Sequence, residues 1–212
     1  MSSSDSTAPA SGKLWNVPNQ ITTARIALAL VMFAAMAFGW YGWALGLFIV
    51  AAGTDWMDGY WARKYNLITQ LGRILDPFAD KLIICGAYTF LAAVPPLADG
   101  TRPSGVAAWM AVVVLGRELL VTALRSFIEQ HGGDFSARWV GKWKMVLQCA
   151  AVAWSLYALT HLAPGGDRWQ TEPAAWLTTG LHAVVWSSVL LTLYSGVEYV
   201  RAGAKVLLKA PD

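Results

Sequence analysis

The chain has 212 residues, of which 56% are hydrophobic and 14% are charged, and its mean hydropathy is +0.44. Soluble domains carry roughly a quarter charged residues, so this composition excludes a disordered chain and a basic nucleic-acid-binding domain and favours one membrane-embedded domain. The formal net charge is only +3. Cys85 and Cys149 lie in apolar stretches without metal-ligand spacing, which argues against a disulfide framework or a zinc site.

In chain order, residues 1–12 are predicted to form a disordered N-terminal tail, because they are small, polar and serine-rich. Apolar runs of about 20 residues follow, a length that lets a helix cross the hydrocarbon core. They lie at 20–38, 42–62, 75–95, 104–128, 139–161 and 174–199. We therefore predict an all-α fold, an integral membrane bundle of six transmembrane helices. It forms one domain over 13–200, followed by a basic C-terminal tail over 201–212.

The positive residues predict the orientation of this bundle. With both termini on one side, the loops on the opposite face contain only Arg102 and Arg168 of the 16 basic residues. The positive-inside rule then places the other face and both termini in the cytoplasm, in an inner or cytoplasmic membrane. Tryptophans near the predicted helix ends fit an interfacial belt. They are Trp15, Trp40, Trp43, Trp109, Trp139, Trp143, Trp169 and Trp176.

Four aspartates stand at the ends of two neighbouring apolar runs. Asp55 and Asp58 share one helical face, and Asp76 and Asp80 are spaced i, i+4 on another. Acids in a membrane are costly enough that a functional role is the first interpretation. A short loop makes the two runs antiparallel neighbours, so both pairs are expected to meet at the cytoplasmic end.

Four nearby carboxylates cannot all stay ionised in a low dielectric without counter-charge. Oxygen ligands without histidine or cysteine favour Mg²⁺ or Mn²⁺, and Mg²⁺ usually keeps positions open for substrate phosphates. A pyrophosphate substrate would suit this site: Gly59 and Ala62 leave room for a nucleotide, and Arg63 and Thr69 could hold its phosphate or ribose. Structural ion pairs with nearby lysines and arginines are the alternative, and Gly59 or Gly72 alone could serve close packing or a turn.

The whole run resembles the CDP-alcohol phosphatidyltransferase family, whose pattern is D-x2-D-G-x2-A-R-x8-G-x3-D-x3-D. Every fixed position is filled, by Asp55, Asp58, Gly59, Ala62, Arg63, Gly72, Asp76 and Asp80. The resemblance implies a six-helix membrane enzyme with two divalent metals that transfers a phosphatidyl group from CDP-diacylglycerol to an alcohol and releases CMP.

The resemblance also assigns roles to residues. It implies that Asp55, Asp58, Asp76 and Asp80 bind the metals and that Asp80 is also the catalytic general base. The implied CDP-diacylglycerol contacts are Asn19, Thr22, Asp55, Asp58, Gly59, Ala62, Arg63, Thr69 and Gly72. Family members resemble homodimers, so a second copy of the chain and membrane lipids are expected partners. No nucleic-acid partner is expected.

Three other stretches are similar to the glycerophosphate-using branch of the family. They are the opening of the first run, from Asn16 to Arg25, the stretch from Arg117 to Arg125, and the stretch from Trp139 to Lys144. A phosphorylated acceptor explains such cations, because each can donate to phosphate oxygens. The predicted acceptor-phosphate residues are Arg25, Arg117, Arg125, Lys142 and Lys144.

Glu118 is expected to pair with one of these arginines. Helix capping remains an alternative for Asn19, and snorkelling at helix ends remains one for Lys142 and Lys144.

The predicted reaction is phosphatidyl transfer to sn-glycerol 3-phosphate. The same chemistry with inositol phosphate, or with phosphatidylglycerol to form cardiolipin, is the nearest alternative. An intramembrane ion or proton transporter is a remote one, since a relay predicts acids spread through the membrane depth, whereas these cluster at one end.

Overall fold

The computed structural model describes residues 17–65, 70–130, 139–162 and 175–207. Within these ranges every regular element is a helix, which confirms the all-α prediction. The helices are α1 (Val17–Ala37), α2 (Tyr41–Tyr65), α3 (Gln70–Ala93), α4 (Ala108–Gln130), α5 (Trp139–Leu162) and α6 (Ala175–Leu207). The predicted disordered tail over 1–12 lies outside the described residues.

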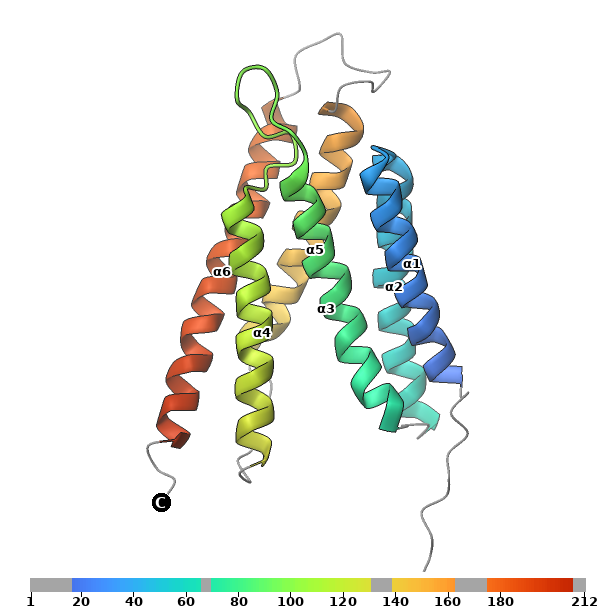
Figure 1. Cartoon of the computed structure of the whole chain (residues 1–212), viewed down its shortest axis with the longest axis vertical. Helices are drawn as coiled ribbons and strands as arrows, with labels where there is room; N and C mark the ends of the chain where they lie inside the picture. The colour runs from blue at the N-terminus through green and yellow to red at the C-terminus, as the bar shows by residue number, and fades with distance from the viewer. Residues whose placement is uncertain (1–16, 66–69, 131–138, 163–174, 208–212) are drawn as a thin grey trace, which may run out of the picture.

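Successive helices run in opposite directions, so one end of the bundle collects the starts of α1, α3 and α5 and the ends of α2, α4 and α6 (Figure 1). α1 packs against α2 and α3, α4 packs against α3 and α6, and α5 packs against α2, α3 and α6. At this end the bundle divides into two legs, one formed by α1, α2 and α3 and the other by α4 and α6 (Figure 1). The divided end is the one that was predicted to face the cytoplasm.

Three helix boundaries differ clearly from the predicted ones. α4 begins at Ala108 rather than at 104, because Gly105 has φ +69°, which a right-handed helix cannot contain. α3 begins at Gln70 rather than at 75 and includes Pro77. α6 continues to Leu207, so it includes the first residues of the predicted basic C-terminal tail over 201–212.

The turn between α1 and α2 is closed by a glycine cap. Gly39 has φ +74°, its N–H donates to the Met36 carbonyl at 3.1 Å, and the Trp40 N–H donates to the Ala35 carbonyl at 2.8 Å. This pattern ends a helix in a left-handed residue, which only glycine adopts without a steric cost. It places α1 and α2 side by side as an antiparallel pair.

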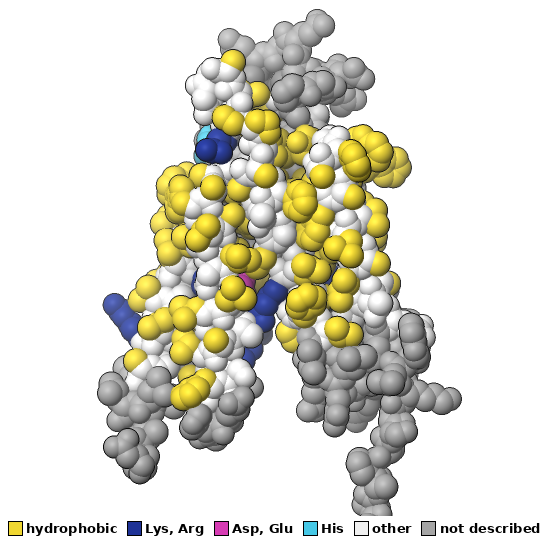
Figure 2. All heavy atoms as spheres, viewed as in Figure 1, with side chains coloured by type: hydrophobic (Ala, Val, Ile, Leu, Met, Phe, Trp, Pro, Cys, Tyr) yellow, Lys and Arg dark blue, Asp and Glu magenta, His cyan; other side chains and the backbone are white. Residues whose placement is uncertain are grey.

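Large apolar side chains cover much of the outer surface as well as the core. Met32, Tyr88, Leu91 and Leu156 are fully buried between the helices, while hydrophobic side chains also spread over the visible outer face (Figure 2). Five of the predicted belt tryptophans are exposed, namely Trp40, Trp43, Trp109, Trp143 and Trp176. An apolar exterior of this extent suits a hydrocarbon solvent rather than water.

In the described part of the chain, three helices are long and apolar enough to cross a membrane, in α1 (Gln20–Ala37), α5 (Gly141–Leu162) and α6 (Ala175–Ala204). α2 contributes a shorter apolar segment, Tyr41–Thr54. The structure therefore has the six predicted helices, and three of them satisfy this criterion within the described residues. α2, α3 and α4 carry the aspartates and arginines of the predicted site, and those charges interrupt their apolar character.

A close approach between α1 and α3 prepares the site. Gly86 on α3 lies against the Phe33 ring of α1, and an added Cβ at Gly86 would collide with that ring. Phe33 also stacks on Phe90, with ring centroids 5.2 Å apart. The missing side chain at Gly86 lets α1 and α3 approach closely, and both helices carry charged residues towards the divided end.

Candidate functional site

The four predicted metal-binding aspartates fall on α2 and α3. Asp55 and Asp58 lie in the last turns of α2, and Asp76 and Asp80 lie in the first half of α3, so their backbones occupy the same end of the bundle. Only the Asp80 side chain is among the described ones. No group of three or more metal-ligating side chains is found among the described residues, a set that excludes three of these four carboxylates.

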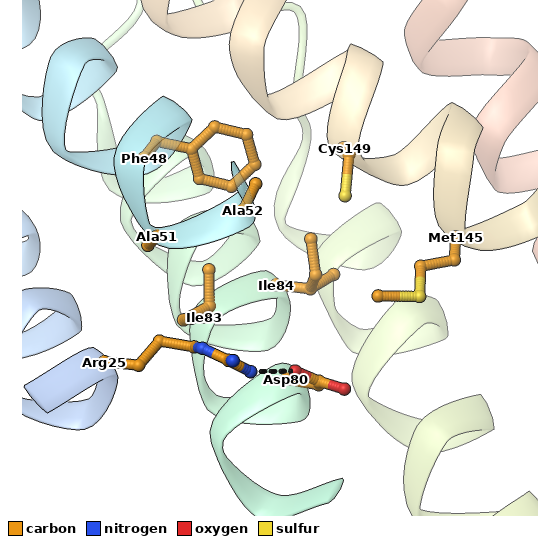
Figure 3. Close-up of a pocket in the computed structure, with 9 residues that line it drawn as sticks. All are labelled: Arg25, Phe48, Ala51, Ala52, Asp80, Ile83, Ile84, Met145 and Cys149. Atoms are coloured by element: carbon orange, nitrogen blue, oxygen red, sulfur yellow. Dashed lines mark hydrogen bonds and ion pairs between the residues drawn. The ribbon is translucent and has the colours of Figure 1, made fainter. Parts of the chain in front are cut away.

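Asp80 forms an ion pair with Arg25. The Arg25 Nη1 donates to Asp80 Oδ1 at 3.0 Å; the side chain of Arg25 is 2% exposed and that of Asp80 is 34% exposed (Figure 3). A buried guanidinium costs several kcal/mol in lost hydration unless an anion faces it. The pair therefore joins α1 to α3, and it leaves part of the carboxylate accessible from outside.

A pocket opens beside this pair, between α1, α2, α3 and α5. It contains about 340 Å³ of empty space, counting the open space at its mouth. Its lining is Arg25, Phe48, Ala51, Ala52, Asp80, Ile83, Ile84, Met145 and Cys149. The apolar side chains surround the space, and Arg25 and Asp80 lie together along one edge of it (Figure 3). α2 and α3, expected as directly neighbouring helices, face each other across this pocket.

A second group of charges, here called the cationic cluster, consists of Arg117, Glu118 and Lys144. The Lys144 Nζ donates to Glu118 Oε1, and Arg117 Nη1 lies 3.4 Å from the same oxygen. The three side chains are between 8% and 11% exposed. Among the described side chains of this group, two cations share one carboxylate, which leaves one positive charge in excess. The expected pairing of Glu118 with an arginine is confirmed.

Lysine and arginine side chains gather where the two legs meet (Figure 2). The five predicted acceptor-phosphate residues nevertheless do not form one group. Arg117 and Lys144 come together, whereas Arg25 is held against Asp80. Arg125 is half-buried on α4, and its buried Nε has no hydrogen-bond partner among the described residues. Lys142 is exposed near the start of α5.

The predicted nucleotide contacts are spread over α1, α2 and α3. Thr22 is buried on α1, one turn before Arg25, and Asn19 precedes it on the same helix. Gly59, Ala62 and Arg63 belong to α2 and Gly72 to α3, at the end shared with the aspartates. The structure describes no side-chain contact for these last positions, and Thr69 lies outside the described residues.

The sequence interpretation predicted the helix α6 but missed its contacts with the site residue Arg117. Arg117 Nη2 donates to Ser195 Oγ at 2.5 Å, and the Arg117 guanidinium carbon lies 5.2 Å from the centre of the Tyr199 ring. About one turn before Ser195 on α6, Thr192 Oγ1 accepts a hydrogen bond from Gln148 Nε2 of α5 at 3.0 Å. A signal was available, since polar residues recur on α6 at helical spacing, but such residues are common in the packed faces of membrane helices.

The outer surface of the helical bundle is apolar, and charged side chains are buried towards its divided end. These features define an integral membrane protein with a polar site at that end. The sequence model described as CDP-alcohol phosphatidyltransferase matches residues 15–194. The chain belongs to this family.

Relatives of known name include the CDP-diacylglycerol–glycerol-3-phosphate 3-phosphatidyltransferase of Bacillus subtilis, 36% identical over 88% of this chain and 94% of the relative. The enzyme of the same name from Escherichia coli K12 is 30% identical, over 92% of this chain and 98% of the relative. A cardiolipin synthase (CMP-forming) from Oryza sativa is 32% identical over 95% of this chain, which spans 61% of that longer protein.

Proposed function

We propose that this protein transfers the phosphatidyl group of CDP-diacylglycerol to sn-glycerol 3-phosphate, which yields phosphatidylglycerol phosphate and CMP. Two relatives named for this reaction match nearly the full length of the chain and support it. The observation that carries the choice of acceptor is the buried excess of positive charge in the cationic cluster. A phosphate monoester supplies the missing negative charge, whereas an uncharged alcohol leaves it uncompensated.

We further propose that all six helices span the membrane and that the divided end faces the cytoplasm. The charges that interrupt α2, α3 and α4 lie towards this end, and the loop of the opposite end contains Arg102. The positive-inside rule supports this orientation. Water-soluble glycerol 3-phosphate would then reach the cationic cluster from the cytoplasm, and the lipid donor would enter from the bilayer.

The donor set fits a hard divalent cation. Asp80 keeps a partly exposed carboxylate at the pocket edge, and the backbone brings Asp55, Asp58 and Asp76 to the same end of the bundle. These four aspartates would hold two Mg²⁺ or Mn²⁺ ions. When bound, the ions supply positive charge that neutralises the pyrophosphate and stabilises the departing CMP.

Asp80 is proposed as the general base. Its carboxylate accepts the proton of the acceptor's 1-hydroxyl while that oxygen forms a bond to the β-phosphorus of CDP-diacylglycerol. The bond between the β-phosphorus and the bridging oxygen breaks, and CMP leaves with the electron pair of that bond. Arg25 holds Asp80 Oδ1 at 3.0 Å and so fixes the orientation of the carboxylate. We therefore assign Arg25 to the orientation of Asp80 and not to the acceptor phosphate.

Arg117, Arg125, Lys142 and Lys144 are proposed to bind the acceptor's phosphate. Arg117 and Lys144 supply the buried charge, the half-buried Arg125 donates a hydrogen bond to the phosphate, and the exposed Lys142 attracts the anion from solvent. Holding the phosphate fixes the distance of the hydroxyl from Asp80, which turns a bimolecular encounter into an oriented one.

An acceptor panel tests this function. The purified protein in mixed micelles is given CDP-diacylglycerol, Mg²⁺ and one of four acceptors: glycerol 3-phosphate, glycerol, inositol phosphate or phosphatidylglycerol. We expect rapid CMP release and a phosphatidylglycerol phosphate product with the first acceptor alone. Rapid turnover with phosphatidylglycerol instead would support the second candidate, cardiolipin synthesis, which the Oryza sativa relative favours.

A further inference from the structure

The side chain of Arg117 crosses from α4 to α6, where three residues surround it. Ser195 Oγ accepts a hydrogen bond from Nη2 at 2.5 Å, and the Tyr199 ring faces the guanidinium at 5.2 Å. Gly196 lies beside the stem of the arginine, where an added Cβ would stand 3.3 Å from Arg117 Cγ. Together Ser195, Gly196 and Tyr199 form what we call the α6 cradle.

The α6 cradle is buried and matched to a cation. Ser195 is fully buried and Tyr199 is 3% exposed. The hydroxyl offers an acceptor, the ring offers the negative face of its quadrupole, and the glycine leaves space for the aliphatic stem. Positions 195, 196 and 199 lie on one side of a helix, so a single face of α6 supplies all three contacts.

The rest of α6 is held in register by two further polar contacts. Gln148 Nε2 donates to Thr192 Oγ1 at 3.0 Å, and the Tyr88 and Ser188 hydroxyls are 2.7 Å apart. All four of these side chains are buried. Because a buried polar group that loses its partner is costly, these contacts fix the position of α6 along its axis and hence that of the α6 cradle.

Charge compensation alone does not explain the position of Arg117. Glu118, its immediate neighbour in sequence, lies 3.4 Å from Nη1 and is shared with Lys144. Nε of Arg117 has no hydrogen-bond partner among the described residues. The guanidinium thus keeps donor capacity and positive charge, while neutral groups of α6 determine where it lies.

We propose that Ser195, Gly196 and Tyr199 are positioning residues, which hold the Arg117 guanidinium where it binds the phosphate of the acceptor. This inference rests on the proposed function, because it takes a phosphorylated acceptor as the ligand of Arg117. α6 thereby becomes part of the acceptor site. All three residues of the cradle lie beyond the stretch over 15–194 that matches the family, so their role is inferred from the contacts in this chain.

The test compares two substitutions of one residue. Tyr199→Leu removes the aromatic face and keeps an apolar side chain, whereas Tyr199→Phe keeps the ring. We expect Tyr199→Leu to raise the KM for glycerol 3-phosphate about tenfold, as befits a desolvated cation–π contact. The KM for CDP-diacylglycerol should stay within about twofold of the unmodified protein, and Tyr199→Phe should restore most of the acceptor affinity.

Tyr194→Leu is the matched control. Tyr194 is on the same helix and 61% exposed, so the same substitution there leaves Arg117 untouched and should change neither KM. If Tyr199→Leu lowers the yield of folded protein, Ser195→Ala and Gly196→Ala decide the question. Both should raise the KM for glycerol 3-phosphate selectively, the second by displacing the arginine stem.

The outcomes separate the two proposals. If the unmodified protein prefers another acceptor, the proposed function fails. If it uses glycerol 3-phosphate but Tyr199→Leu alters neither KM, or raises both equally, the α6 cradle is only a packing contact and the further inference fails. A selective effect that Tyr199→Phe does not rescue would also contradict the role of the ring.

Discussion

The pocket beside Asp80 and the cationic cluster border the same helix, α5, but their described charges are balanced differently. Met145 lines the pocket and its neighbour Lys144 belongs to the cluster. At the edge of the pocket, Arg25 forms an ion pair with Asp80, so these two described charges balance each other. In the cluster, two cations share Glu118 and one positive charge is in excess.

This difference separates two tasks within one membrane enzyme. A neutral pair at the edge of an apolar pocket suits a lipid donor and a carboxylate that must accept a proton. A buried positive excess is costly on its own, and an anionic ligand relieves that cost. The substitutions below should therefore affect either the chemistry or the binding of the acceptor, but not both to the same extent.

Removal of divalent metal should have the largest effect. Four aspartates without a soft ligand motivate this expectation, because the pyrophosphate charge then has no counter-charge in the site. CMP release should fall to the background with EDTA and return with Mg²⁺ or Mn²⁺. Full activity in a chelated assay would contradict the proposed metal site.

Asp80→Asn should come next in size. The amide keeps the shape of the side chain and cannot accept the proton, so kcat should fall by about 10²- to 10⁴-fold. Binding of CDP-diacylglycerol, measured by titration, should persist. A nearly normal kcat in this variant would require another proton acceptor.

Arg125→Ala tests the proposed binding of the acceptor's phosphate. A hydrogen bond to a charged group contributes roughly 1.5–3 kcal/mol, so the KM for glycerol 3-phosphate should rise by about one to two powers of ten. Steady-state kinetics should show little change in the KM for CDP-diacylglycerol. If only the lipid KM changed, Arg125 would serve as a headgroup anchor instead.

Arg25→Lys should give the smallest effect. Lysine keeps the charge but loses the fixed geometry of the guanidinium, so kcat should fall about fivefold to tenfold through the orientation of Asp80. The KM for glycerol 3-phosphate should hardly change. A selective rise in that KM would return Arg25 to the acceptor site, as the sequence alone had indicated.

The sequence predicted the six helices and the position of the aspartates at one end of the bundle, because both depend on local spacing. Apolar runs of membrane length define the six helices, and helical periodicity places Asp76 and Asp80 on one face. The helix starts were less predictable. Gly105 adopts a left-handed backbone, so α4 begins after it and not at the start of the apolar run.

Long-range pairings could not be predicted from spacing. Arg25 and Asp80 are 55 residues apart, and the short distance between them depends on the packing of α1 on α3 around Gly86. The partners of Arg117 on α6 were hidden for the same reason, since serine and tyrosine are unremarkable in a membrane helix. The sequence therefore assigned all five cations to one ligand, whereas the structure divides them.

Inhibition by inorganic phosphate tests the separation of the two sites most directly, and it needs no substitution. Phosphate carries the group that the cationic cluster is proposed to bind and lacks the hydroxyl that reacts. At a fixed, saturating concentration of free Mg²⁺, we expect phosphate to compete with glycerol 3-phosphate and to leave the KM for CDP-diacylglycerol unchanged. Competition with CDP-diacylglycerol, and none with glycerol 3-phosphate, would contradict the assignment of the cationic cluster to the acceptor.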